Sequence, residues 1–192
     1  MNYLKNESLP IITERLLLRL LEPTEAGLMV TYLTENREHL TPWEPVRTDA
    51  YYSLELWERE LRSRQGQFFS GEAARLVMLL KDKPLGPVIG VTNFTEIMRG
   101  VFQACFLGYS LHHQYQGQGF MFEALSAAID YMYETFHMHR VMANYMPHNV
   151  RSGELLKRLG FTVEGYARDY LKIAGQWEDH ILTAKIAAQN AQ

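Results

Sequence analysis

Two glycines lie close together where one apolar segment ends and another begins. The segment from Gln116 to Gly119 follows the apolar run from Val101 to Leu111 and directly precedes Phe120 and Met121. A strand-to-helix turn of this kind leaves the first N–H groups of the helix unpartnered, with the positive end of the helix dipole behind them. Glycine has no Cβ that would hold a phosphate away from this backbone. The segment therefore predicts an anion site, and a diphosphate fits it best.

Two other phosphate-binding motifs are excluded at particular positions. A nucleotide P-loop requires Gly-Lys-Ser or Gly-Lys-Thr, and the segment contains neither. A dinucleotide-binding turn requires a third small residue where this chain has Phe122, and the region before the turn is not an N-terminal strand. A glycine-rich turn that binds no ligand stays open as the alternative.

The elements around this turn follow from the pattern of apolar residues. The run from Val101 to Leu111 is apolar at both alternating sets of positions, which is typical of a central strand covered by helices on both sides. A helix is predicted from about Gly119 to Phe136, because apolar residues recur there at intervals of three and four. The residues of this stripe are Met121, Leu125, Ile129, Met132 and Phe136.

The rest of the chain predicts a mixed α/β domain. Further strands are predicted over 14–20, 75–80, 88–94, 141–145, 161–171 and 177–185, and further helices behind Thr24, from Ser53, and over 150–159. Asn149 is a candidate N-cap for the last of these helices, and Gly160 is a candidate end. This order combines antiparallel hairpins with crossover units in one sheet.

Composition supports one globular domain. The 192 residues are enough for one well-buried core, and 47% apolar with 21% charged residues are typical proportions. The net charge of -3 gives no reason to expect nucleic acid as a partner, and no apolar run approaches the roughly 18 to 20 residues of a membrane span. The N-terminus lacks the pattern of a signal peptide, so a cytoplasmic location is expected. Residues 187–192 are expected to form a frayed tail.

Metal binding and cysteine chemistry are not predicted. Cys105 is the only cysteine, which excludes an internal disulfide or a multi-cysteine zinc site. The pairs His112-His113 and His137-x-His139 lack a carboxylate or cysteine at ligand spacing.

The turn also matches a known motif. Gln114-Tyr-Gln-Gly117-Gln-Gly119 has the pattern Gln/Arg-x-x-Gly-x-Gly/Ala, and Asn149-Val-Arg-Ser152 follows later in the chain. With these two segments the chain resembles the general N-acetyltransferase (GNAT) superfamily. The resemblance implies the GNAT fold, an α/β (α+β) domain over 1–192 with a strongly twisted mixed sheet of about six to seven strands and helices on both faces. It also implies acetyl-CoA as co-substrate and no metal.

The resemblance places the acetyl-CoA contacts on three neighbouring elements. The turn would hold the diphosphate, the preceding strand would pair its backbone with the pantetheine, and the helix from Val150 would lie beside the thiol. The residues assigned to acetyl-CoA are Leu107, Tyr109, Ser110, Leu111, Gln116, Gly117, Gln118, Gly119, Phe120, Met121, Asn149, Ser152 and Leu156.

Two residues are candidates for proton transfer. Many relatives carry a Tyr acid seven residues after the Asn, but this chain has Leu156 there, so Ser152 is the natural substitute. A Ser in the first turn of a helix is also a common local cap. Asp169 is the candidate base, directly or through a water, and a solvated strand carboxylate is its alternative reading. An α-amine needs only a modest acceptor, since its pKa of about 7.7 to 8.0 leaves roughly a tenth neutral at pH 7.

Longer strings point to one branch of the superfamily. The segments from Trp43 to Arg47 and from Met142 to Asn149 are similar to the RimJ branch, whose members acetylate the N-terminal alanine of a small-subunit ribosomal protein. The resemblance implies such an acceptor, association with ribosome precursors, and Trp43, Glu44 and Tyr170 as substrate-binding residues. A polyamine, amino acid or antibiotic amine as the acceptor, or a ribosome-assembly factor with secondary catalysis, stays open.

Overall fold

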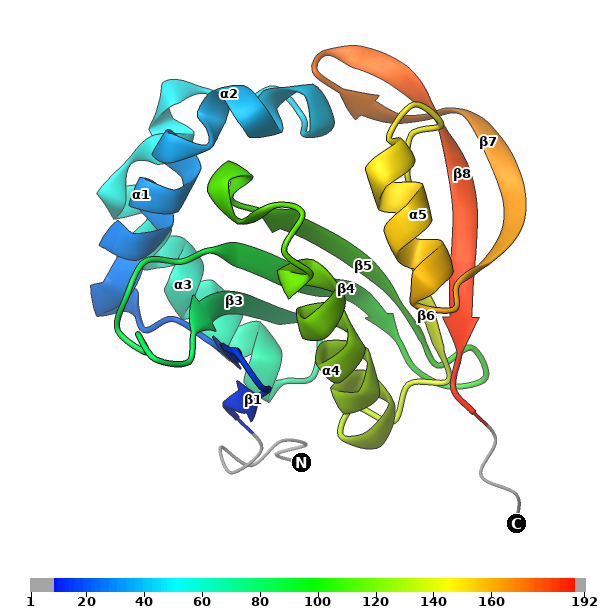
Figure 1. The fold of residues 1–192 in the computed structure, drawn as a ribbon, viewed down its shortest axis with the longest axis horizontal. Coiled ribbons are helices and arrows are strands. Elements are labelled where there is room, and N and C mark those ends of the chain that lie inside the picture. Colours follow the sequence, from blue (N-terminus) through cyan, green and yellow to red (C-terminus); the bar gives the residue numbers. More distant parts are fainter. Residues whose placement is uncertain (1–8, 189–192) are drawn as a thin grey trace.

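The structure, a computed structural model, describes residues 9–188 of the chain. Eight strands form one sheet (Figure 1), namely β1 (Ile11–Ile12), β2 (Leu16–Arg19), β3 (Ala74–Leu80), β4 (Gly90–Met98), β5 (Ala104–Leu111), β6 (Arg140–Met142), β7 (Thr162–Ile173) and β8 (Gln176–Ile186). Their order across the sheet is β1-β2-β3-β4-β5-β6-β8-β7. The pair β5 and β6 is parallel, and the other pairs of neighbours in the described chain are antiparallel.

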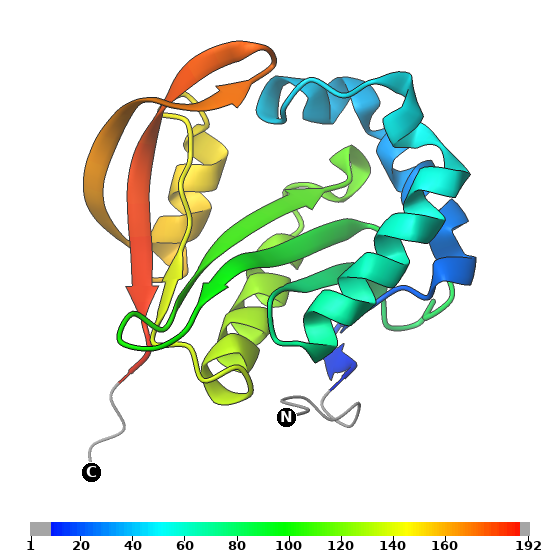
Figure 2. The same ribbon diagram turned by 180° about the vertical axis from the view of Figure 1, so that it is seen from behind.

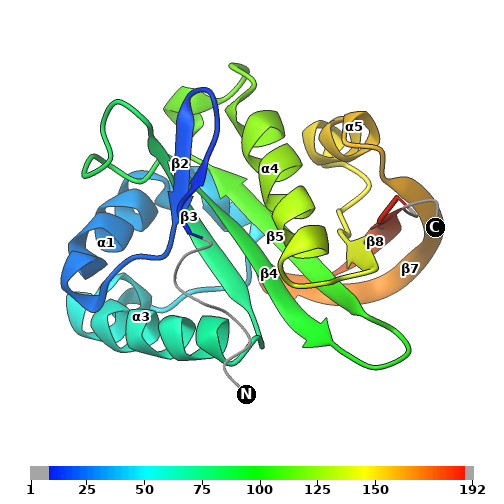
Figure 3. The same cartoon turned by 90° about the horizontal axis from the view of Figure 1, so that it is seen from below.

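Helices cover both faces of this sheet. The α-helices are α1 (Ala26–Glu35), α2 (Arg37–Leu40), α3 (Leu54–Phe69), α4 (Phe120–Glu134) and α5 (Val150–Arg158). The short 3-10 helices are η2 (Pro23–Glu25), η3 (Thr41–Trp43), η4 (Asp49–Tyr52) and η5 (His113–Tyr115). Figure 3 shows α1 and α3 on one face of the sheet and α4 and α5 on the other. None of the helices in residues 9–188 has the length and apolar character needed to cross a membrane.

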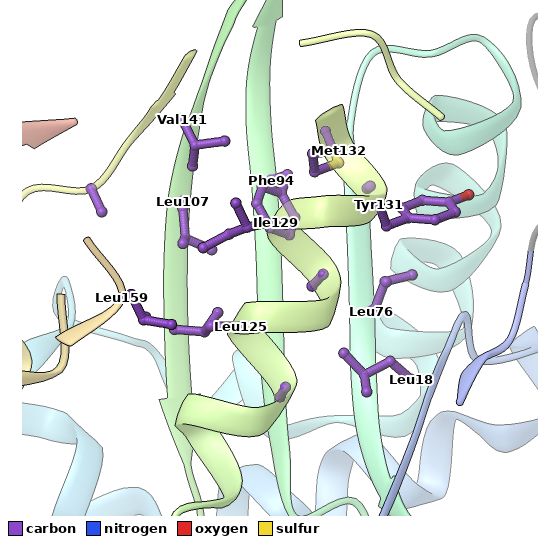
Figure 4. Packing of buried hydrophobic residues seen from close by; sticks show 14 of the residues in the cluster. Leu18, Leu76, Phe94, Leu107, Leu125, Ile129, Tyr131, Met132, Val141 and Leu159 are labelled. Carbon is purple, nitrogen blue, oxygen red and sulfur yellow. The ribbon is translucent and has the colours of Figure 1, made fainter. Parts of the chain in front are cut away.

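The core beneath α4 confirms the predicted apolar stripe. All five stripe residues are buried, and Leu125, Ile129 and Met132 are fully enclosed. They belong to one cluster with Phe94 and Leu107 of the two central strands (Figure 4). Burial of each such side chain stabilises the fold by about 1.5 to 3 kcal/mol, so the position of α4 on the sheet is fixed by its own sequence.

The helix α3 fills the opposite face. The predicted start at Ser53 is confirmed, and Ser53 is the N-cap, since its Oγ accepts a hydrogen bond from the N–H of Leu56 at 3.3 Å. The side chains of Trp57, Leu61 and Phe68 are buried and recur at helical spacing. A charged residue, Arg64, falls within this same stripe.

The parallel strands β5 and β6 separate soon after they pair. The strand β6 pairs with β5 only over the three positions Ala104, Cys105 and Phe106. Beyond Met142, the chain turns toward β8 instead, and Tyr145 forms a bridge with Ile181. Because β4 occupies the other edge of β5, alternate N–H and C=O groups from Leu107 to Leu111 face this gap without a strand partner.

The helix α5 stands beside this gap, and its ends are set by local sequence. Asn149 is its N-cap, as predicted, and its Oδ1 accepts the N–H of Ser152 at 3.2 Å. Gly160 follows the helix with a φ of +85°, a conformation that favours glycine.

Several predicted boundaries need correction. The sequence also indicates Thr24 as an N-cap, and this prediction was wrong, because Thr24 lies inside η2, whose N-cap is Glu22, and α1 begins only after Glu25. The central strand begins at Ala104 rather than Val101, since Val101 lies fully exposed in the preceding turn. The sheet has one strand more than the upper predicted number because the two-residue β1 joins its edge. Of the predicted tail, 189–192 lies outside the described residues, and the N–H of Ala187 donates to the His139 carbonyl at 2.9 Å.

Candidate active site

The glycine turn has the backbone conformation that glycine permits. Gly117 and Gly119 adopt φ values of +74° and +81°, which strain residues that carry a side chain. The first backbone bond into α4 runs from the N–H of Glu123 to the carbonyl of Gly119 at 3.1 Å. Consequently the amides of Gly119, Phe120, Met121 and Phe122 have no acceptor among residues 9–188. This arrangement fits an anion, since donors and helix dipole act on the same place.

Neighbouring elements fix this turn in place. The guanidinium of Arg15 forms an ion pair with Glu123 at 2.6 Å, and its Nη1 donates to the carbonyl of Gln118 at 3.0 Å. On the other side, the fully buried Asn36 accepts the N–H of His113 at 2.9 Å. The carboxylate of Glu123 is thereby neutralised, so it leaves the positive potential of the helix start largely intact.

The side chain of Gln116 connects both walls of the site. Its Oε1 accepts a hydrogen bond from Arg151 of α5 at 2.6 Å, and its Nε2 lies 2.8 Å from the Nε2 of His39 in α2. Burial and neighbouring cations lower the pKa of His39, which favours the neutral ring in this contact. Sequence reasoning missed the roles of both Arg151, although it lies within the Asn149–Ser152 segment, and His39, because only the fold brings them to Gln116.

The two β5 side chains that border the gap most closely point to opposite faces. Ser110 contacts the hydroxyl of Tyr32 at 2.9 Å on the α1 face, whereas the Tyr109 hydroxyl lies 2.7 Å from Ser152 Oγ on the α5 face. Burial raises the pKa of Tyr109 to about 12, so its hydroxyl stays protonated at neutral pH. The structure therefore brings together Tyr109 and Ser152, which were predicted from separate segments.

Four of the predicted cofactor residues, Leu107 among them, have side chains that belong to the core. Leu156 is only 1% exposed, and Phe120 and Met121 are also buried. The side chains of Phe120 and Met121 hold α4 against the sheet while their amides stay available at its start. A direct contact of Leu156 with the cofactor stays a prediction.

A second group of predicted residues lies on the loop that follows α2. The side chain of Glu44 lies 3.7 Å from Arg47, and burial raises the pKa of this carboxyl despite the cation. Its main-chain carbonyl accepts the N–H of Ala174, so the loop contacts the turn between β7 and β8. The ring of Trp43 lies 5.6 Å from that of His148, beside α5, and is 37% exposed. These contacts connect the two halves of the molecule across the top of Figure 1.

A cavity of about 270 Å³ lies beneath this loop. Both cationic and anionic side chains line it, with Glu44, Arg37 and Arg47 among them. Arg37 forms an ion pair with Asp49 at 2.8 Å, and Ala174 closes the cavity from the side of the β7–β8 turn.

Asp169 and Tyr170 lie on the outer strand β7. Asp169 is exposed in a bulge with a φ of +47°, and its N–H donates to the Asp179 carboxylate at 2.8 Å. No hydrogen bond joins the Asp169 carboxylate to Ser152 within residues 9–188. The hydroxyl of Tyr170 accepts from Asn144 at 3.2 Å, which places Tyr170 near the end of β6. Asp169 therefore stays a prediction as the base.

The groups available for binding at this site are backbone amides, which suit a ligand with a diphosphate better than a metal ion. No group of three His, Cys, Asp or Glu side chains able to hold a metal ion occurs in the part of the chain that the structure describes. The open edge of β5 leads through η5 and the glycine turn to the unpartnered amides at the α4 start. Such an arrangement fits an extended chain that ends in a diphosphate.

Comparisons with known proteins agree with this site. A family model described as an acetyltransferase (GNAT) domain matches residues 15–162. The chain is 49% identical over 174 residues to the [ribosomal protein uS5]-alanine N-acetyltransferase of Escherichia coli (strain K12), covering 91% of this chain and 89% of the relative. The chain therefore belongs to the GNAT acetyltransferases. It is an N-acetyltransferase with acetyl-CoA as its acetyl donor, which confirms the predicted family, activity and co-substrate.

Solved structures confirm the predicted fold class. The crystal structure of ribosomal-protein-S5-alanine acetyltransferase from Vibrio fischeri matches with a TM-score of 0.89 at 38% identity, covering 94% of this chain and 98% of that one. RimJ of Mycobacterium smegmatis, in complex with CoA-disulfide, matches with a TM-score of 0.84 at 25% identity, covering 92% and 84%.

Proposed function

We propose that this enzyme acetylates the N-terminal α-amine of a small-subunit ribosomal protein, with alanine as the first residue, in the cytoplasm. The observation that carries the proposal is the 49% identity to an enzyme named for ribosomal protein uS5 and alanine, over 91% of the chain. A match over 174 of the 192 residues includes the loop after α2 as well as the glycine turn. It therefore includes the elements that would face the acceptor, and not only those that would hold the donor.

The donor side follows from the backbone. The amides of Gly119, Phe120 and Met121 would bind the diphosphate, and the open edge from Leu107 to Leu111 would pair with the pantetheine. Asn149 uses its Oδ1 as the helix cap, which leaves its amide N–H₂ free for the cofactor. These contacts position the thioester, and positioning is the largest part of the catalysis we propose.

The acid is Ser152. When bound, acetyl-CoA supplies the thioester carbonyl that the acceptor amine attacks, and its thiolate must be protonated on departure. The Oγ of Ser152 passes its proton to the thiolate and takes one in return from the Tyr109 hydroxyl, 2.7 Å away, and water then returns a proton to Tyr109. Tyr109 is suited to this role because its raised pKa keeps it a donor across the working range.

The base needs little strength. Because an α-amine has a pKa of about 7.7 to 8.0, a useful fraction is neutral at pH 7, whereas a lysine side chain would cost about 3.5 kcal/mol more to deprotonate. We propose Asp169 as the acceptor of the proton, with a water as carrier, since its carboxylate is exposed. An exposed carboxylate is adequate for an α-amine and would be a poor base for a lysine.

The acceptor side takes a cationic N-terminus. Glu44 places a half-buried carboxylate at the edge of the cavity below the α2 loop, where it would attract the ammonium form of the amine. We propose that Trp43 and Tyr170 border the path of the following residues from opposite walls.

A panel of acceptors tests the proposal. The enzyme is incubated with acetyl-CoA and either octapeptides that begin with Ala, Ser or Met, or a polyamine, free amino acids and an aminoglycoside. We expect mass spectrometry to show acetylation at the α-amine of the Ala peptide with the highest kcat/KM. Preferred turnover of a small amine would replace the ribosomal acceptor with a metabolite. Co-sedimentation with ribosome precursors, with and without acetyl-CoA, tests the proposed association separately, and binding without turnover would indicate an assembly factor.

A further inference from the structure

One charged side chain in the core-facing stripe of α3 has no acid partner. Arg64 follows Trp57 and Leu61 at helical spacing, so it points toward the sheet rather than into solvent. Its guanidinium stacks on the Trp57 ring at 4.5 Å, and its buried Nε has no hydrogen-bond partner. None of the ion pairs within residues 9–188 includes Arg64. Arg64 is half-buried, and a charged group whose Nε is buried is ordinarily paired, so this guanidinium lacks its counterpart.

The residues near Arg64 do not neutralise it. Burial and the neighbouring Arg75 lower the pKa of Arg64 to about 10, so the group is still cationic at neutral pH. Arg75 itself donates to Gln67, a neutral amide. Glu60 acts on both arginines without a direct ion pair. Glu96 also acts on Arg75, and neither arginine forms a direct ion pair with a carboxylate within residues 9–188.

The same face of the sheet contains a buried oxygen atom that accepts no hydrogen bond. Over β5 this face is not covered by a helix within residues 9–188. Arg75 of β3, Asn93 of β4 and Gly108 of β5 are cross-strand partners, so they share the face that α3 covers. The Oδ1 of Asn93 is buried without a hydrogen-bond partner. Gly108 is exposed, and a Cβ built there would meet nothing within 4 Å. Figure 2 shows this side of the sheet, where α3 lies over β3 and no drawn helix lies over β5.

The spacing relates these groups to the reacting amine. Gly108 lies in the part of β5 that would hold the pantetheine, and Arg75 lies two strands away, about 10 Å at the usual strand separation. An extended peptide advances about 3.4 Å per residue. A chain whose amine lies at the gap beside Gly108 would therefore bring roughly its third or fourth residue to the arginines.

We propose that Arg64, assisted by Arg75, binds the carboxylate of an acidic side chain in the acceptor, roughly three residues after its α-amine. The proposal rests on the function proposed above and adds a charge preference to it. Asn93 supplies an acceptor for a main-chain N–H of the same segment, since its Oδ1 has no other donor. The charges of the acceptor peptide would then complement those of the enzyme, because its ammonium group would lie near Glu44 and its carboxylate near Arg64.

Peptide scanning with the intact enzyme tests this. A neutral Ala-initiated octapeptide is compared with peptides that carry a single Glu or, as the isosteric control, Gln at each position from 2 to 6. We expect Glu at position 3 or 4 to lower KM about tenfold relative to Gln, with little change in kcat. Arg64→Gln should abolish the difference, whereas the matched control Arg62→Gln, at an exposed position of the same helix, should retain it.

The outcomes separate a binding role from a structural one. If Arg64 only packs on Trp57, Arg64→Gln will lower the melting temperature and the wild-type enzyme will treat Glu and Gln peptides alike. The wild-type comparison alone overturns the proposal in that case, even if the variant does not fold. Arg64→Lys, which keeps the charge, should retain part of the preference. Acetylation of the Ala peptides with no charge preference refutes this inference only, whereas no acetylation of any peptide refutes the proposed function with it.

Discussion

Gly119 offers the sharpest perturbation of the donor site. Its φ of +81° lies in the left-handed region, where a residue with a side chain costs about 1 to 2 kcal/mol. A Cβ built there would lie 3.5 Å from Arg15 Nη2, an ordinary contact, so Gly119→Ala introduces backbone strain without a clash. The free protein can relieve the strain by rearranging the turn, which moves the amides of Phe120 and Met121 out of line.

The binding of CoA must then reverse that rearrangement. A relief of about 1 to 2 kcal/mol in the free protein raises the Kd roughly 5- to 30-fold. Gly119→Val should exceed this range, because a β-branched residue fits the left-handed region worse. Isothermal titration calorimetry with CoA measures the Kd, and circular dichroism checks that each variant is folded.

Gly66→Ala is the matched control. Gly66 lies inside α3, has ordinary helical backbone, and a Cβ built there meets nothing within 4 Å. This variant should gain up to about 1 kcal/mol of stability from helix propensity and bind CoA as the wild type does. Unchanged CoA affinity in folded Gly119→Ala and Gly119→Val would refute the assignment of the turn.

The remaining predictions concern proton transfer and the acceptor. Ser152→Ala should lower kcat about 100-fold in steady-state assays, and Tyr109→Phe should lower it less. Because Tyr109 acts through Ser152, the double variant should be no slower than Ser152→Ala, and additive losses would contradict this. Burial raises the pKa of Glu44 above its unfolded value, so the folded wild type loses stability as pH rises through the raised pKa. Thermal melts should therefore show Glu44→Gln gaining on the wild type as the pH rises above 4.5, while its KM for an Ala peptide rises. A stability difference that is constant with pH would count against the burial of this charge. Asp169→Asn keeps a residue that tolerates the positive φ and should move the kcat/KM profile to higher pH, and an unmoved profile would clear Asp169.

Local patterns were enough to predict the elements that position the donor. The α4 stripe, the helix start at Ser53, the cap at Asn149 and the glycine end of α5 each depend on residues close together in the chain, and each is confirmed. The contact between Tyr109 and Ser152 joins two segments 43 residues apart, yet both residues were named in advance, because the family motif already implied that β5 and α5 are neighbours.

The acceptor side could not be predicted in the same way. The bridge from Gln116 to His39 and Arg151 depends on how α2 and α5 pack, and no spacing in the sequence indicates it. Arg64 offered one overlooked signal, since it is a charged residue in phase with Trp57 and Leu61 on an amphipathic helix. An exposed carboxylate was the alternative reading of Asp169, but the bulge in β7 that contains it was not predictable, because the bulge arises from pairing with β8.

The central claim is that free amides at the start of α4 bind the diphosphate of acetyl-CoA while the edge of β5 binds the pantetheine. Amide NMR titration of the enzyme with CoA, and separately with pantetheine, which has no diphosphate, tests it most directly. We expect the amide resonances of Gly119, Phe120 and Met121 to shift on addition of CoA and not of pantetheine. The resonances from Leu107 to Leu111 should shift with either compound. Resonances of Gly119 to Met121 that stay fixed on CoA binding, or that respond equally to pantetheine, would contradict the claim.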